Sequence, residues 1–233
     1  YFRVDIEDFS LDLFGQSLSG NFSFEQVISP GLDGDFSTSD DEKTLKLAVS
    51  DLSLFLGDTG GTEGFENNSD DIGLWITGGI AQFLISPRGI VGEFTATAKV
   101  FIERGQGIEV DRVIVRINNT LEVVDESFRI GDVETQLSLP AGPYISVKVE
   151  GLNIELGGQI IAADFTFIRE TDLGTDKMVG GSGAAADISV TQVMLENVLI
   201  SLSSNGHEFV RAESPVDPTD ATKTIPSTLE IIS

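Results

Sequence analysis

Acidic side chains gathered in one loop are the residues of this chain best suited to chemistry. Residues 29–42 read SPGLDGDFSTSDDE, a composition typical of a loop. Calcium prefers six to eight hard oxygen ligands, which carboxylates and backbone carbonyls can supply. The spacing is neither that of an EF-hand nor the nonapeptide pattern of a calcium-binding β-roll, which favours a solvated loop that keeps β surfaces apart. Calcium is the one cofactor suggested, and the candidate ligands are Asp33, Asp35, Asp40, Asp41 and Glu42.

The sequence contains few residues suited to nucleophilic or acid–base catalysis. His207 is the single histidine and no cysteine is present, so an arrangement of nucleophile, base and orienting group is not supported. A glycoside hydrolase needs two carboxylates at a defined separation, and among 38 acidic residues no pair stands out. We therefore expect a protein that is not an enzyme.

The charge balance narrows the range of partners. Against the 38 acidic residues stand 14 basic ones, for a net charge of −24. Such a surface repels phosphate backbones and anionic lipid surfaces, and no apolar run is long enough for a membrane span. We expect no nucleic-acid partner and no membrane insertion. Because Tyr1 falls inside a repeated segment, we also expect the chain to be a processed product or part of something longer.

The strongest pattern is an internal repeat. Residues 1–24 (YFRVDIEDFSLDLFGQSLSGNFSF) align without a gap to residues 144–167 (YISVKVEGLNIELGGQIIAADFTF) at an offset of 143. Agreement over an ungapped run indicates a repeated structural unit. The identical pairs are Tyr1/Tyr144, Val4/Val147, Glu7/Glu150, Leu13/Leu156, Gly15/Gly158, Gln16/Gln159, Phe22/Phe165 and Phe24/Phe167.

Each repeated segment carries a slip in its alternation of apolar and polar residues. Val4 and Ile6 are followed by Phe9 and Leu11, and this odd step moves the apolar side to the other face unless the strand bulges or bends. The same slip occurs four times, and the residue types at the slip tolerate left-handed backbone. We predict a β-bulge or sheet corner at Asp8, Asp51, Gly151 and Asn197.

These patterns predict an all-β chain of elongated, repeat-based antiparallel sheets with long, bulged strands, similar to a β-sandwich or a solenoid. No stretch shows a helical period. We expect a first β repeat unit over residues 1–143, a second, partial unit over residues 144–212, and a Pro-rich linker or tail over residues 213–233.

Short motifs in these strands resemble the tandem units of very large, adhesin-like bacterial secreted and surface proteins. The motifs are FSLDLFGQSLSGNFSFEQ, LNIELGGQIIAADFTF and the LPAGPY segment from Leu139 to Tyr144. The resemblance implies a secreted or cell-surface structural protein that forms or extends a β-rich rod, filament or adhesin stalk. Its partners would be copies of itself or adjacent repeats of the same chain, joined by repeat stacking and strand-edge pairing. The alternative is a calcium-dependent β-sandwich module that binds a carbohydrate or another surface.

Overall fold

A computed structural model describes ten segments of the chain: residues 1–13, 16–30, 41–58, 72–103, 106–130, 133–175, 186–204, 207–217, 220–224 and 227–232. These segments contain β-strands and no helix. The strands are β1 (Phe2–Leu13), β2 (Gln16–Ser29), β3 (Glu42–Asp58), β4 (Ile72–Ser86), β5 (Gly89–Glu103), β6 (Gln106–Asn118), β7 (Val124–Ile130), β8 (Val133–Leu139), β9 (Tyr144–Leu156), β10 (Gln159–Asp172), β11 (Ile188–Ser204), β12 (His207–Glu213), β13 (Val216–Asp217), β14 (Asp220–Thr224) and β15 (Ser227–Ile232).

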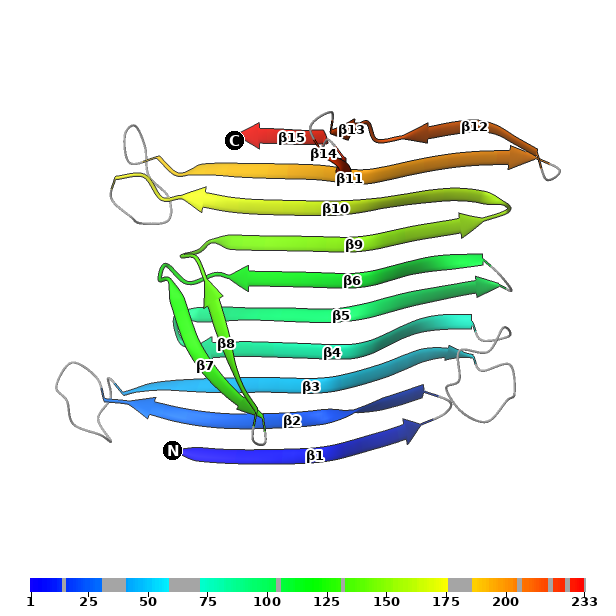
Figure 1. The fold of residues 1–233 in the computed structure, drawn as a ribbon. Coiled ribbons are helices and arrows are strands. Elements are labelled where there is room, and N and C mark those ends of the chain that lie inside the picture. Colours follow the sequence, from blue (N-terminus) through cyan, green and yellow to red (C-terminus); the bar gives the residue numbers. More distant parts are fainter. Residues whose placement is uncertain are drawn as a thin grey trace.

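Most of these strands form one open antiparallel sheet, in the order β1-β2-β3-β4-β5-β6-β9-β10-β11-β12, with β15 also paired to β11 (Figure 1). The expected all-β class with long, bulged strands is confirmed. Among the described strands, the element that packs on this large sheet is the two-stranded sheet of the β7–β8 hairpin. The expected boundary at residues 143/144 falls inside the sheet, where β6 pairs with β9.

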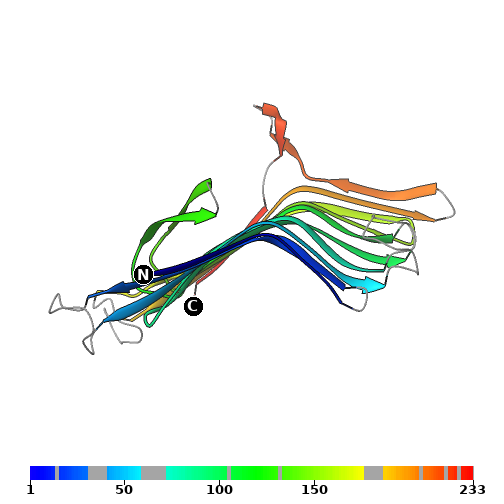
Figure 2. The ribbon, with the colours of Figure 1, turned by 90° about the horizontal axis from the view of Figure 1, so that it is seen from below.

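The sheet is bent across the middle of its strands, as Figure 2 shows. The bend lies at the predicted bulges. Asp8, Asp51 and Asn197 have φ values of 51°, 53° and 53°, and Gly151 has a φ of 65°. The strand registers shift at the same places. The prediction of a bulge or corner at these four residues is therefore confirmed.

Each bulge adds one residue to its strand and keeps the apolar side chains on one face. Between the pairs Ile6–Phe22 and Phe9–Gly20, β1 advances three residues while β2 advances two. The extra residue cancels the odd step in the sequence pattern. The apolar residues before and after the bend thus share one face.

The hairpin β7–β8 packs on the opposite, polar face of the sheet. Its side chains form a buried hydrophobic cluster with two residues of the sheet, and burying each large side chain stabilises the fold by about 1.5–3 kcal/mol. Lys46 of β3 donates to Glu126 Oε2 of the hairpin over 2.8 Å, and its ammonium lies 5.5 Å from the centre of the Phe128 ring. The cluster consists of Ala48, Val91, Val124, Phe128, Ile130, Leu137 and Leu139.

A buried asparagine fixes the base of this hairpin. Asn118, at the end of β6, is fully buried. Its Nδ2 donates to the carbonyls of Glu122 and Pro140 over 2.9 and 2.6 Å. Its Oδ1 accepts from the backbone nitrogen and the hydroxyl of Thr120 over 2.9 and 2.7 Å. One side chain thus joins the segment entering the hairpin to the segment leaving it.

Candidate functional site: the bend, the apolar face and the sheet edges

The polar side of the bend carries a line of hydrogen bonds from strand to strand. Asn21 Oδ1 accepts from the backbone nitrogen of Asp8 over 2.9 Å, and its Nδ2 donates to Asp51 Oδ2 over 3.0 Å. Asn21 on β2 therefore joins the bulges of β1 and β3. A buried or half-buried bulge would otherwise leave backbone groups without partners.

A second line of hydrogen bonds repeats this arrangement in the other half of the sheet. Asp164 Oδ1 accepts from the backbone nitrogen of Gly151 over 2.7 Å, and Asp164 Oδ2 accepts from Asn197 Nδ2. Asp164 on β10 thus does for β9 and β11 what Asn21 does for β1 and β3. The sequence pattern located the bulge residues but not Asn21 and Asp164, although an offset of 143 relates them.

A hollow of about 260 Å³ lies on the polar face at the bend, beside the tip of the hairpin. It is lined by Glu7, Asp8, Asn21, Ser50, Asp51, Ile130 and Val133. Five of these seven residues are polar or acidic, yet the described residues contain no group of three or more His, Cys, Asp or Glu side chains placed to hold a metal ion.

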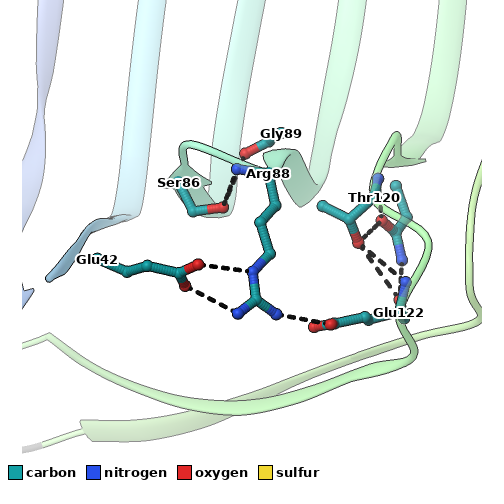
Figure 3. Close-up of polar contacts among 7 residues, drawn as sticks. Glu42, Ser86, Arg88, Gly89, Thr120 and Glu122 are labelled. Atoms are coloured by element: carbon teal, nitrogen blue, oxygen red, sulfur yellow. Dashed lines mark hydrogen bonds and ion pairs between the residues drawn. The ribbon is translucent and has the colours of Figure 1, made fainter. Parts of the chain in front are cut away.

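Only some of the predicted calcium ligands belong to the residues that the structure describes. Asp33, Asp35 and Asp40 lie outside the described residues. Glu42 is at the start of β3, where the Arg88 guanidinium contacts its carboxylate at 3.0 Å and contacts Glu122 at 2.6 Å (Figure 3). The hydrogen bond to Glu42 raises the pKa of Arg88 above its ordinary value. A calcium ion at Glu42 would compete with this ion pair, and calcium binding remains a prediction.

The face opposite the hairpin is apolar across the whole sheet; we call it the apolar face. One row of directly paired residues crosses nine strands before the bend: Ile6, Phe22, Val49, Ala81, Phe94, Val115, Val147, Phe167 and Val193. A second row crosses eight strands after the bend: Leu56, Leu74, Val100, Ile108, Ile154, Ile161, Ile200 and Ala212.

Charged residues are almost confined to the other face. Directly paired residues share a face, and on this basis the charged residues on the apolar face are Lys43, Asp58 and Arg169, all near strand ends. The polar face carries the ion pairs Arg3–Asp5, Lys46–Glu126 and Arg116–Glu93. Exposed apolar patches of more than a few hundred Å² mark interaction surfaces.

Comparison of the chain with protein-family models, with curated proteins and with solved structures finds no match. The surfaces of the sheet itself therefore indicate the function. In the described residues no helix is long and apolar enough to cross a membrane.

The two edges of the sheet are the remaining candidate surfaces. β1 is the first strand, and its outer edge has no partner among the described strands. At the other edge, β12 and β15 both pair with β11, β12 along Leu199–Ser204 and β15 along Val190–Leu195. Unpaired edges of long strands are sites where another strand adds to a sheet.

Proposed function

We propose that this chain is a structural β module that extends a sheet by pairing its edges with copies of itself or with adjacent repeats of the same chain. In this proposal it forms part of a β-rich rod, filament or stalk at the outside of a cell. The observation that carries the proposal is the match between the open edge strand β1 and the interior strand β9.

The hairpins β1–β2 and β9–β10 correspond pair for pair. Val4 pairs with Phe24 and Ile6 with Phe22, while Val147 pairs with Phe167 and Val149 with Phe165. Each relation holds at the offset of 143, and the bulge residues Asp8 and Gly151 correspond as well. On its other side, β9 is paired with β6 over Gly107–Asn118. The free edge of β1 therefore has the shape of an edge that accepts a strand inside this same sheet.

The opposite edge of the sheet, at β11, also supports the proposal of edge pairing. β11 corresponds to β3 at an offset of 146, and β3 is paired with β4 from Leu45 to Asp58, on both sides of the bend. β12 covers the half of β11 after the bend and β15 covers the half before it. Leu195 pairs with Ser227 as Val49 pairs with Ala81. Together β12 and β15 take the place of β4, with β13 and β14 inserted at the bend.

The segment 213–233, which we expected to be a linker or tail, thus contributes β15 to the main sheet. In the sheet interior the strand in this position, β4, is followed by β5. Each added strand would bring backbone hydrogen bonds that contribute roughly 0.5–1.5 kcal/mol each. Both edges therefore resemble interior pairing surfaces.

Sedimentation velocity over a range of protein concentrations, with electron microscopy of the same samples, tests the proposal. We expect concentration-dependent assembly into elongated particles. The double variant V4K/I6K places two lysines on the edge strand, and charges there block edge pairing. The matched variant L45K/I85K places two lysines on paired residues of interior strands, on the same face. Assembly that survives V4K/I6K, or a wild-type chain that stays monomeric at all concentrations, would contradict edge pairing.

The experiment also separates the two candidate surfaces. If the chain assembles through the apolar face, L45K/I85K should disrupt assembly as strongly as V4K/I6K does. If it assembles through the edges, only V4K/I6K should do so.

A further inference from the structure

The apolar face lies on the inner side of the bend. In Figure 2 the β7–β8 hairpin sits on the outer side of the bent sheet, and its cluster packs on the polar face. The apolar face is therefore concave and forms a trough that runs across the strands. No described element packs across it, since β7 and β8 contact β2, β3, β5 and β6 from the other side.

The dimensions of the trough make it too large to be an incidental patch. The face spans ten strands at a spacing of about 4.8 Å, and most of these strands are more than ten residues long. Its area is therefore roughly 2,000 Å². Several of its large side chains are exposed, among them Ile6 at 39%, Ile85 at 38% and Leu56 at 46%. A patch of this size requires an occupant that removes it from water.

A second copy of the chain fits this trough poorly in either orientation. Two concave faces that meet would touch along their outer parts and leave the crease of the bend unfilled. If the copies nested, the polar face of one would enter the trough of the other. That face carries Arg3, Asp5 and Glu93 in ion pairs, whose charges would lose water without gaining partners.

We propose that the trough binds the acyl chains of lipid molecules. Aliphatic chains are flexible, carry no charge and can follow a concave surface that lacks hydrogen-bonding side chains along its rows. The charge of the protein favours lipids with a neutral or zwitterionic head group, because 38 acidic residues oppose 14 basic ones and would repel an anionic head group. This inference does not depend on edge pairing, since a single sheet already presents the trough.

Lipid uptake from phosphatidylcholine vesicles tests the proposal. The protein is incubated with vesicles, separated from them, and analysed for bound lipid by native mass spectrometry and by extraction. The trough variant L45E/I85E alters two directly paired residues of the apolar face. The control variant I80E/T95E alters two directly paired residues of the same neighbourhood on the polar face and adds the same charge. We expect the wild type and the control to carry lipid and the trough variant to lose about tenfold in bound lipid, because its carboxylates must lose water as the trough fills.

A second measurement keeps the test valid if L45E/I85E does not fold. The chain has no cysteine, so I85C and I80C each offer one site for a polarity-sensitive fluorophore. Ile85 faces the trough and Ile80, on the same strand, faces away from it; both are partly exposed, at 38% and 46%. Adding phosphatidylcholine vesicles should shift the emission to the blue at position 85 and leave position 80 unchanged.

Three results would overturn the proposal. Wild-type protein could emerge from the incubation without lipid, or both labelled positions could respond alike. Alternatively, sedimentation of lipid-free protein could show a dimer that L45E/I85E dissociates and I80E/T95E does not. The last result would assign the trough to a second copy of the chain.

Discussion

Asn21 and Asp164 hold the same position in two matching hairpins and make the same two contacts with amide and carboxylate exchanged. Asn21 accepts from the Asp8 nitrogen and donates to Asp51. Asp164 accepts from the Gly151 nitrogen and accepts again from Asn197. Each bend is therefore held by one amide and one carboxylate. We therefore expect stability to depend on the hydrogen bond between them and not on which strand supplies which group.

This exchange predicts a reciprocal rescue. The single variant N21D places two carboxylates where an amide met a carboxylate, and we expect a loss of about 1 kcal/mol in the free energy of unfolding. The double variant N21D/D51N recreates the arrangement of Asp164 and Asn197 and should recover most of that loss. Denaturant unfolding of the two single variants and the double variant forms a mutant cycle. Additive effects would show that the two side chains are not coupled.

The backbone at the bulge makes a second prediction, for Asp8. Its φ of 51° lies in the left-handed region, as does the φ of 65° at the corresponding Gly151. D8G should leave thermal stability nearly unchanged because the matching hairpin already uses glycine. D8V should cost about 1–2 kcal/mol, since a β-branched side chain is strained in left-handed backbone. The control is V4A on the same strand, which shortens a side chain away from the bulge.

The bend was the part of the fold that the sequence predicted best, because a bulge leaves a local signature. An apolar alternation that slips by one residue at Asp8, Asp51, Gly151 or Asn197 is visible within ten residues. The unsplit sheet was not visible in this way. Whether strands pair in one layer or two depends on contacts between distant residues, such as Val115 with Val147.

The positions of the hairpin and of the C-terminal strand depend on distant contacts in the same way. The sequences of β7 and β8 resemble those of the neighbouring strands, and the contacts of Asn118 with Glu122 and Pro140 lie where the chain turns onto the polar face. β15 read as a short apolar end to a linker, since its pairing with β11 spans more than thirty residues of chain. In the sequence, Asn118 ends an apolar strand and directly precedes two polar residues. This pattern is only a weak signal for a buried asparagine.

Asn118 carries a third prediction, on how the hairpin is held. N118A removes a fully buried side chain with four hydrogen bonds, and it takes one donor from each of the Glu122 and Pro140 carbonyls. We expect a loss of at least about 2 kcal/mol in the free energy of unfolding, together with faster proteolysis within the hairpin. N119A, at the exposed neighbour that accepts from the Ile90 nitrogen, should cost less. Equal losses in the two variants would contradict the central role of Asn118.

Calcium dependence gives a fourth prediction. Glu42 contacts Arg88, and the proposed structural role does not require an ion. Chelation of divalent cations should therefore leave the thermal midpoint unchanged. R88A should lower stability only slightly, and by less still at high salt, because the ion pair is exposed. A large fall in the midpoint on chelation, restored by calcium, would instead support the calcium-dependent binding module.

The ion pair at the start of β1 makes the last prediction, on stability at acid pH. Arg3 donates to the Asp5 carboxylate over 2.9 Å and also to the backbone carbonyl of Arg129 in the hairpin over 3.1 Å. The hydrogen bond from Arg3, with a second from Ser23, lowers the pKa of Asp5 below its ordinary value. Because the carboxyl binds its proton more weakly in the folded chain, its contribution is complete above the unfolded-state pKa of about 3.9 and is lost as the pH falls through the lower folded value. Unfolding free energies of the wild type and D5N, measured from neutral pH to about pH 2, should therefore differ most above pH 4 and converge below it, since the other carboxylates titrate equally in both proteins. A difference that stays constant across this range would mean that Asp5 stabilises the fold without its charge.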